Sequence, residues 1–288
     1  MKPAAKFICG DALEEIRKLE AHSVDCVVTS PPYWGLRDYG VPGQLGMEKH
    51  PDLFVESLVE TLSECARAMR SDATMWVNIA DSYIGGGRAG RNKEYMKRHT
   101  MFGRTVDESK LGRYGVPMGI PKGLKKKDMA LVPQRFALAM QAAGFYVRSH
   151  VVWHKPNPMP SNCTDRPTVA TESIFMFSVR PKYYYNAAAV KEIGKGGKPR
   201  NLRNVWECTV NAKGGHHTAA YPERLIEPCI LAGSRPMGTV LDPFGGSGTT
   251  AACALRNCRN AISIDLNPEY TDMAERRCAF IPTRNGVL

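Results

Sequence analysis

Short apolar runs alternate along this chain with stretches whose apolar residues recur at helical spacing. The apolar run 24–28 precedes a helical pattern at 54–69, and a second apolar run follows at 74–80. The rhythm returns near the C-terminus, where a strand at 239–241 leads through a glycine-rich turn to a helix at 251–256. This alternation predicts an α/β fold with a doubly wound, mostly parallel sheet.

The same patterns place the remaining elements. Further strands are expected at 6–9, 145–153, 171–179 and 261–264, and further helices at 13–19, 128–143, 223–232 and 270–279. Gly144 and Gly233 are expected to end the helices that precede them.

Two Gly-rich segments together carry more positive charge than the net +11 of the chain, and the remainder is slightly acidic. Residues 85–127 hold twelve Lys/Arg against three Asp/Glu, and residues 191–213 hold six against two. Neither segment shows a sustained period, and the first is too long for an ordinary connection. Many basic loops only aid solubility, but a local excess of this size more often marks a polyanion partner, with nucleic acid first. The candidate DNA-contacting side chains are Arg88, Arg91, Lys97, Arg98, Lys125, Lys126, Lys127, Lys198, Arg200 and Arg203.

A stiff loop is expected directly after the strand at 24–28, where residues 29–34 read Thr-Ser-Pro-Pro-Tyr-Trp. Neither proline can donate an N–H, and each holds the residue before it extended, so the strand must end there. Open α/β sheets bind ligands at the carboxyl ends of their strands. The Ser30 hydroxyl and two exposed aromatic faces, Tyr33 and Trp34, suit a flat ring that carries an amino group. A Pro-rich turn with a buried aromatic side chain fits the hexapeptide equally well.

A nucleotide-type pocket is expected at residues 242–250, which read Asp-Pro-Phe-Gly-Gly-Ser-Gly-Thr-Thr. Glycines between a strand and a helix let a ligand approach the backbone, and the helix N-terminus favours a negative group. Asp265 follows Gly245 by 20 residues, an offset at which an acid can hold ribose hydroxyls. The turn has no phosphate-binding lysine, which favours an adenosine bearing a carboxylate over a nucleoside triphosphate. Asp11 follows the first strand and either caps the next helix or reaches a ligand.

The two stretches together resemble the S-adenosylmethionine-dependent amino-methyltransferases that act on DNA, the N4-cytosine/N6-adenine family. Ser30-Pro31-Pro32-Tyr33 matches the family's (Asp/Asn/Ser)-Pro-Pro-(Tyr/Phe) motif, and 242–250 matches its cofactor motif. Residues 153–160 and 221–233 are also similar to the family. The catalytic motif precedes the cofactor motif, as in the permuted beta group, which implies a circularly permuted, Rossmann-like methyltransferase fold.

The resemblance implies S-adenosyl-L-methionine as the cofactor and double-stranded DNA as the partner. It implies catalytic roles for Ser30, Pro31, Pro32 and Tyr33. It implies cofactor-binding roles for Asp11, Asp242, Phe244, Gly245, Gly246, Ser247, Gly248, Thr249, Thr250 and Asp265. The catalytic domain would comprise residues 1–84, 128–190 and 217–288. The basic insertions would be 85–127 and 191–216; the second has the usual place of the target-recognition region, and which of the two reads the DNA sequence stays open.

The implied reaction is methyl transfer to the exocyclic amino group of a flipped base. Ser30 Oγ and the Pro31 carbonyl would accept the two amino hydrogens, Tyr33 would stack on the base, and Trp34 would support that wall or pack beneath it. Serine at this place resembles the cytosine-N4 enzymes, whereas aspartate usually accompanies adenine-N6 methylation, so cytosine is preferred and adenine is the alternative. An NAD-dependent oxidoreductase would leave the proline loop unexplained, and a non-catalytic DNA-binding protein would need neither motif.

Composition excludes several other classes. The nine cysteines form no Cys-x-x-Cys pair, and the adjacent His216 and His217 lack ligand spacing, so no metal site is expected. No charged-then-apolar leader opens the chain, and no apolar run approaches the ~20 residues that span a bilayer. We expect a cytoplasmic protein of a bacterial or phage-infected cell, monomeric or dimeric, working with a cognate restriction endonuclease or with none.

Overall fold

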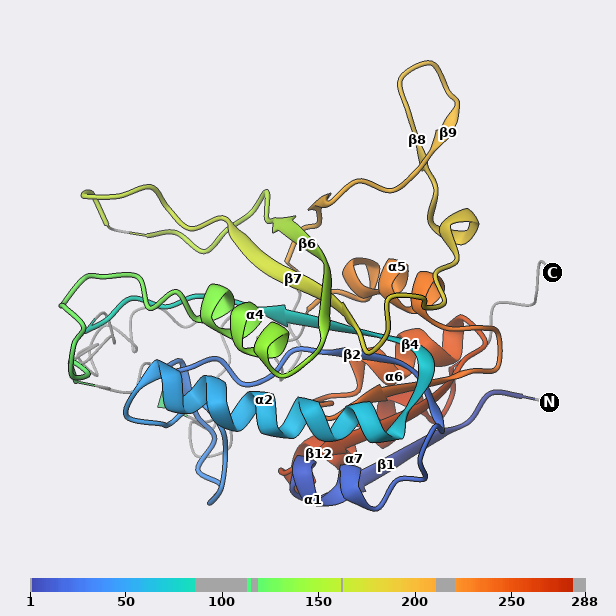
Figure 1. The fold of residues 1–288 in the computed structure, drawn as a ribbon, viewed down its shortest axis with the longest axis horizontal. Helices are drawn as coiled ribbons and strands as arrows, with labels where there is room; N and C mark the ends of the chain where they lie inside the picture. The colour runs from blue at the N-terminus through green and yellow to red at the C-terminus, as the bar shows by residue number, and fades with distance from the viewer. Residues whose placement is uncertain (1, 86–112, 115–118, 162, 211–220, 282–288) are drawn as a thin grey trace.

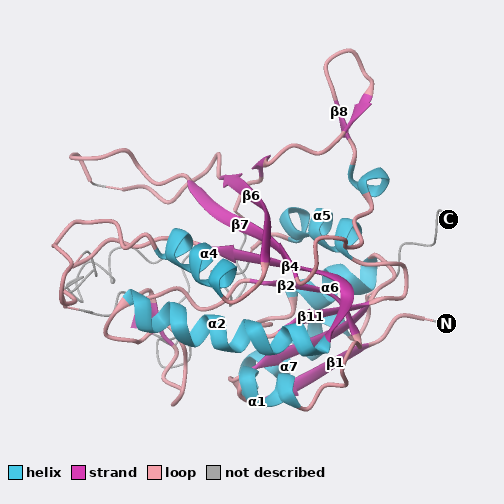
Figure 2. Ribbon diagram, in the orientation of Figure 1, coloured by secondary structure: helices cyan, strands magenta, loops and turns pink. Residues whose placement is uncertain are grey.

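One mixed sheet of eight strands organises the molecule (Figures 1 and 2). The computed structural model describes residues 2–85, 113–114, 119–161, 163–210 and 221–281. In spatial order the strands are β1 (Ala5–Cys9), β12 (Asn260–Asp265), β11 (Thr239–Asp242), β2 (Val24–Thr29), β4 (Met69–Ile79), β7 (Thr171–Ser178), β6 (Tyr146–His154) and β10 (Val205–Glu207). The first five are mutually parallel, β7 is antiparallel to both of its neighbours, and β10 is parallel to β6. The predicted mostly parallel, doubly wound sheet is confirmed.

Helices cover both faces of this sheet (Figures 1 and 2). On one face lie α1 (Ala12–Arg17), α2 (Pro51–Ala68) and α4 (Val132–Ala142), and on the other α5 (Glu223–Gly233) and α6 (Thr249–Arg256). The last helix, α7 (Pro268–Cys278), packs against α6 and the β1–β12 edge. Among the described residues, no helix is long and apolar enough to cross a membrane.

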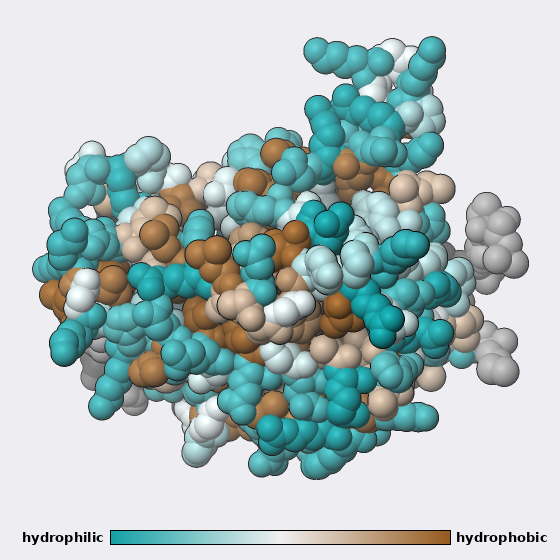
Figure 3. Space-filling model, viewed as in Figure 1, coloured by the Kyte–Doolittle hydropathy of each residue, from teal (hydrophilic) through white to brown (hydrophobic). Residues whose placement is uncertain are grey.

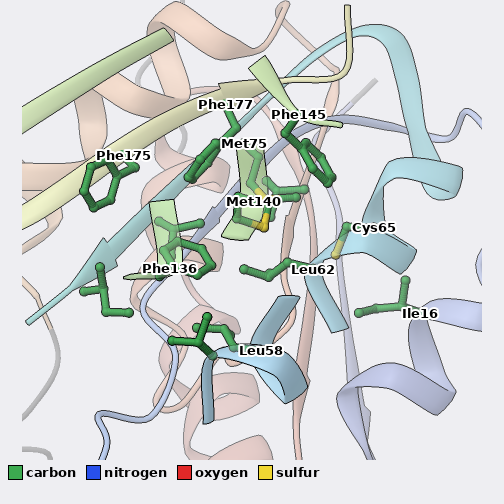
Figure 4. Packing of buried hydrophobic residues seen from close by; sticks show 14 of the residues in the cluster. Ile16, Leu58, Leu62, Cys65, Met75, Phe136, Met140, Phe145, Phe175 and Phe177 are labelled. Atoms are coloured by element: carbon green, nitrogen blue, oxygen red, sulfur yellow. The ribbon is translucent and has the colours of Figure 1, made fainter. Parts of the chain in front are cut away.

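An aromatic cluster fills the space between α2, α4 and the sheet (Figure 4). The rings of Phe136 on α4 and Phe177 on β7 meet edge to face, with centroids 5.6 Å apart. Leu58 and Leu62 of α2 and Met75 of β4 complete the layer, and all five side chains are fully buried. Their burial contributes about 1.5–3 kcal/mol per large side chain before the entropy of ordering is subtracted. The sheet that carries the functional loops is therefore rigid.

The segment after residue 190 is more structured than its sequence indicates. A short 3₁₀ helix, η3 (Ala187–Val190), leads into a hairpin of β8 (Glu192–Ile193) and β9 (Pro199–Arg200), after which β10 pairs with β6 at the sheet edge. These strands contain two or three residues each, too few to show a period. The other small sheet pairs β3 (Arg37–Asp38) with β5 (Arg113–Tyr114).

Gly233 is the last residue of α5, so the helix ends one residue later than expected. A Cβ there would meet Thr74 Oγ1 at 2.5 Å and Cys26 Sγ at 2.7 Å. The glycine therefore serves the close approach of α5 to β2 and β4. Gly144, by contrast, follows α4 with a φ of +95°, as expected of a residue that ends a helix.

The carboxyl ends of the five parallel strands meet along one edge of the sheet. Asp11, Asp265, Asp242, Ser30 and Asp81 occupy those ends in the order of β1, β12, β11, β2 and β4. Residues far apart in the sequence are thereby brought to one place, at the sheet edge where ligands bind in open α/β folds.

Candidate active site

The Ser30–Tyr33 loop leaves β2 as a closed turn. The Leu36 N–H donates to the Tyr33 carbonyl (3.2 Å), and the Gly35 N–H donates to the Gly46 carbonyl (2.8 Å). Gly46 has a φ of +96° and comes so close that a Cβ there would lie 3.1 Å from the Tyr33 carbonyl oxygen. The loop is held by its own backbone before any ligand arrives.

Trp34 is not an exposed aromatic face, which corrects the expectation from sequence. Its side chain is 3% exposed and belongs to the core under α2, and its Nε1 donates to the Glu48 carbonyl (2.8 Å). A ring whose N–H finds a partner inside the protein has no reason to remain in water. Tyr33 is less buried than Trp34, and both residues line the adjoining pocket.

The Tyr33 hydroxyl is the centre of a buried polar network. It donates to Glu172 Oε2 (2.6 Å) and accepts from Asn78 Nδ2 (2.7 Å), while Ser30 Oγ donates to it at 3.3 Å. Burial, and then the neighbouring Glu172 carboxylate, raise the pKa of Tyr33 well above its usual value. Tyr33 is therefore a phenol that donates a hydrogen bond, held beside Ser30.

Glu172 and Lys155 form an ion pair whose side chains are only 11% and 18% exposed. The Lys155 ammonium also lies 4.6 Å from the centre of the Trp153 ring. With Tyr33 and Trp34 the pair lines a pocket of about 200 Å³, which Val169, Asp81 and Ser82 help to close. Sequence analysis did not identify Glu172 or Asn78; the only signal was a carboxylate within the otherwise apolar strand pattern at 171–179.

Close packing fixes the glycine turn between β11 and α6. A Cβ on Gly245 would lie 1.9 Å from Ser263 Oγ, and one on Gly248, where φ is +78°, would lie 2.7 Å from Ala274 Cβ. The Gly246 N–H donates to Asp265 Oδ2 and the Asn267 N–H to Asp265 Oδ1, both at 2.8 Å. These contacts hold the Asp265 carboxylate at the mouth of the turn, and burial raises its pKa to about 6.

Asp242 joins the two predicted loops through its side chain. This carboxylate is 3% exposed and accepts from Thr29 Oγ1 (2.6 Å), the Phe244 N–H (3.1 Å), Tyr221 Oη (3.2 Å) and Thr250 Oγ1. Thr29 is the residue directly before Ser30. Asp242 and Thr250 thus set the position of the Ser30–Tyr33 loop against the 242–250 turn, a role that the sequence analysis did not assign to them.

Other members of the cofactor motif also have protein partners. Arg277 of α7 donates to Thr249 Oγ1 (2.9 Å) and approaches Ser247 Oγ at 3.4 Å. Asp11 caps α1, since its Oδ1 accepts from the Glu14 N–H at 3.0 Å. The adjoining Gly10 N–H donates to the Asp265 carbonyl (3.0 Å), which places Asp11 and Asp265 at neighbouring strand ends.

The candidate DNA-contacting residues fall into three sets. Arg88, Arg91, Lys97 and Arg98 lie outside the described residues, as do His216 and His217. Lys125 and Lys126 are exposed, and Lys127 pairs with Asp165 (2.7 Å), which joins residues 119–131 to the 155–170 loop beside the strand ends. Lys198, Arg200 and Arg203 lie on or after the β8–β9 hairpin, where both arginines pair with Glu192 (2.8 and 2.7 Å).

The hairpin and the active-site loops project from different parts of the molecule. In Figure 1 the hairpin rises at the upper right, whereas the 119–131 and 155–170 loops extend to the left. The tip of the hairpin is teal and white in Figure 3, although Ile193 of β8 is an exposed apolar residue. Within the described ranges, no three His, Cys, Asp or Glu side chains come together to hold a metal ion.

A family model described as DNA methylase, for N6/N4 methyltransferases, matches residues 24–276. The chain belongs to this family. Its relatives include the Type II methyltransferase M.Cfr9I of Citrobacter freundii, 44% identical over 93% of this chain and 85% of the relative. The Type II methyltransferase M.SmaI of Serratia marcescens is 42% identical over 95% and 90% of the two chains.

Solved structures share the fold. The PvuII DNA methyltransferase, titled cytosine-N4-specific, superposes with a TM-score of 0.70 at 19% identity and covers 99% of this chain and 89% of its own. A putative DNA modification methylase from Thermus thermophilus, solved with S-adenosyl-L-methionine, gives a TM-score of 0.63 at 20% identity over 98% and 95%. The circularly permuted, Rossmann-like methyltransferase fold is confirmed.

Family membership makes this chain an S-adenosylmethionine-dependent DNA amino-methyltransferase, as its two motifs indicated. The oxidoreductase and the non-catalytic alternatives are thereby set aside. The pocket fits the cofactor, because each Asp265 carboxylate oxygen accepts one N–H and keeps a lone pair for a ribose hydroxyl. Beside it, Phe244 and Gly246 are the partly exposed residues of the turn.

Cofactor affinity should depend on the protonation of Asp265. Its pKa of about 6 means that binding below that pH must first remove a proton, so affinity should fall as the pH drops through about 6 and level off above it. Asp265→Asn should bind S-adenosylmethionine about 10- to 100-fold more weakly, because hydrogen bonds to a charged group are lost. Its affinity should also lose the pH dependence. Calorimetric titration checks both, with the exposed Asp272→Asn as the control; a pH-dependent Asp265→Asn would contradict the assignment.

Proposed function

We propose that this protein is a site-specific DNA methyltransferase that methylates N4 of a flipped cytosine. The observation that carries the proposal is the Ser30 hydroxyl, held by the proline loop and by Asn78 and Tyr33 at the strand end next to the cofactor loop. A neutral hydroxyl that donates to Tyr33 keeps lone pairs that can accept a hydrogen from an amino group. The relative of known structure titled cytosine-N4-specific supports the choice of cytosine.

The geometry suits an amino group that is a poor nucleophile. Its lone pair is delocalised into the ring, so two acceptors are needed to draw the nitrogen toward a tetrahedral shape. Ser30 Oγ and the Pro31 carbonyl supply them, and they also stabilise positive charge that moves from sulfonium to nitrogen. S-Adenosylmethionine, when bound, provides the methyl group. The loop is built before substrate binds, so little reorganisation is required.

The flipped base would enter the pocket beside Tyr33. Because Asn78 and Glu172 hold the hydroxyl, the Tyr33 ring is fixed as one wall, on which a planar base can stack. Lys155, Val169 and Ser82 form other parts of the lining.

Depurination distinguishes cytosine from adenine without knowledge of the recognition sequence. Genomic DNA is labelled with tritiated S-adenosylmethionine and the purified protein, and mild acid then releases the purine bases. Label that stays with the apurinic polymer supports cytosine. Label released with the free purines would establish adenine-N6 methylation instead.

The 119–131 segment is proposed to hold DNA phosphates beside the active site. Each such contact contributes about 0.9 to the slope of log affinity against log salt. Replacing Lys125, Lys126 and Lys127 with glutamine should therefore flatten the slope by about 1 to 2, because Lys127 pairs with Asp165 and Lys125 with Asp128. Filter binding at several salt concentrations measures it. The control replaces three exposed lysines at the opposite edge of the sheet, Lys2, Lys6 and Lys182, and an unchanged slope in the first variant would exclude this segment.

The biological setting is proposed from the relatives, which are named Type II methyltransferases. We infer that the protein acts on double-stranded DNA in the cytoplasm of a bacterial or phage-infected cell, as a monomer or dimer. A cognate restriction endonuclease would share its recognition sequence, or the methyltransferase would act alone. The basic hairpin at 191–203 and the insertion at 85–127 are both proposed to contact DNA.

A further inference from the structure

A chain of hydroxyls connects the proposed methylation site to one carboxylate. Ser30 Oγ donates to Tyr33 Oη (3.3 Å), and Tyr33 Oη donates to Glu172 Oε2 (2.6 Å). All three side chains are partly or largely buried, and they come from two elements far apart in the sequence, the loop after β2 and the strand β7. Both donors point in the same direction, from the site toward Glu172.

Amino methylation creates a need for such a carboxylate. When the nitrogen gains a methyl group while keeping both hydrogens, it carries a positive charge and must release a proton. Serine is a neutral acceptor and cannot retain that proton, whereas a carboxylate can. In a site with serine in the motif, a carboxylate within reach of that serine can take up the proton.

The other carboxylates at this sheet edge are not connected to Ser30 through hydrogen bonds that the structure shows. Asp81 lines the same pocket, but it accepts the backbone N–H groups of Ser82, Leu131 and Val132 at the start of α4. Asp242 bonds to Thr29 rather than to Ser30. Among the described residues that line the pocket, Glu172 is the carboxylate that the Ser30–Tyr33 chain reaches.

We propose that Glu172 is the terminal proton acceptor of the methyl transfer, reached through Ser30 and Tyr33. This inference rests on the proposed function. As the bond between N4 and the methyl carbon forms and the bond from that carbon to sulfur breaks, one N4 proton passes to Ser30 Oγ. Ser30 passes its own proton to Tyr33 Oη, and Tyr33 passes its own to Glu172 Oε2. The products are the N4-methylated base, neutral S-adenosylhomocysteine and protonated Glu172, which then returns its proton to water.

The groups around Glu172 suit this role. The carboxylate is faced by Lys155 after β6, Asn78 on β4 and Tyr33 after β2. The Lys155 ammonium forms an ion pair with the carboxylate. Asn78 Nδ2 lies 2.7 Å from both Tyr33 Oη and Glu172 Oε2 and holds the two groups in line. The raised pKa of Tyr33 keeps its proton on the oxygen until one arrives from Ser30. Lys155 and Asn78 are thus positioning residues.

Tyr33→Phe tests the relay with the smallest change, since it removes one oxygen and leaves the ring and the Glu172–Lys155 pair. Single-turnover methyl transfer is measured from about pH 5 to pH 9 in water and in heavy water, where the wild-type rate should rise with pH to a plateau and show a solvent isotope effect. The variant should be about 100-fold slower, with both the rise and the isotope effect lost. The exposed Tyr146→Phe serves as the matched control and should behave as wild type.

Glu172→Gln should give the same loss, and combining it with Tyr33→Phe should add little because the groups act as one unit. If the unpaired Lys155 charge prevents folding, Glu172→Gln with Lys155→Met restores neutrality and should show the same rate defect. A slower Tyr33→Phe that keeps the wild-type pH profile and isotope effect would overturn the relay and leave only an anchoring role. If methylated cytosine is still the product and Ser30→Ala is still inactive, the proposed function survives that result; label on adenine would overturn the function itself.

Discussion

Ser30→Ala should lower the single-turnover rate of methyl transfer by about 100- to 1,000-fold, the usual cost of removing one preorganised group that stabilises charge in a transition state. The variant loses the acceptor for one amino hydrogen and also the first link to Tyr33. The fold should be unaffected, because Ser30 is only partly buried and the loop is closed by backbone bonds at Gly35 and Leu36. Rapid-quench assays with saturating DNA and labelled cofactor measure the rate.

Cofactor affinity should stay within about twofold of wild type, since Ser30 contacts none of the glycine turn and independent sites contribute additively. Ser71→Ala, at an exposed position near the other end of β4, is the control and should leave the rate unchanged. A Ser30→Ala enzyme with wild-type turnover would show that Ser30 has no role in the reaction. If the only defect of the variant is a lower cofactor affinity, Ser30 would have to be assigned to cofactor binding instead.

Asp242→Ala should destabilise the protein by about 3 kcal/mol or more, because it leaves several buried hydrogen-bond donors without an acceptor. The Thr29, Thr250 and Tyr221 hydroxyls all donate to this carboxylate, and Asp242 itself is 3% exposed. Loss of the link should also let the catalytic loop move against the cofactor loop. Activity measured in fully folded samples should therefore fall as well.

Urea denaturation provides the free energy of unfolding for this comparison. The control is Asp272→Ala, an exposed aspartate on α7, which should change stability by less than about 0.5 kcal/mol. Asp242→Asn retains one acceptor oxygen, so its loss in the free energy of unfolding should lie between those of Asp242→Ala and Asp272→Ala. A loss under about 1 kcal/mol for Asp242→Ala would contradict the structural role of this side chain.

The sequence predicts those parts of the site that are encoded within a short stretch of residues next to one strand. The Pro31–Pro32 pair and the glycine turn each follow a recognisable strand, and backbone chemistry alone puts both at the carboxyl edge of a parallel sheet. Asp265 was identified in the same way, from its offset beyond the turn. The structure places all three at neighbouring strand ends.

The parts that were missed depend on contacts across the sheet. Glu172 and Asn78 are 94 residues apart, yet they lie on the adjacent antiparallel strands β7 and β4. A local hydrophobic pattern does not show which strands are neighbours in the sheet. The sequence therefore could not identify Asn78 as a partner of the Glu172 carboxylate. The sequence left Trp34 open between an exposed face and a packed ring for a similar reason, because its acceptor is the Glu48 carbonyl on the returning part of the loop.

The identity of the methylated base tests the central claim most directly. The protein is expressed in a host that lacks DNA methyltransferases of its own, and the host DNA is digested to nucleosides, separated by chromatography and identified by mass. The account predicts N4-methyldeoxycytidine, resolved from its 5-methyl isomer by retention time, and its absence when Ser30→Ala is expressed instead. N6-methyldeoxyadenosine as the methylated nucleoside would contradict it.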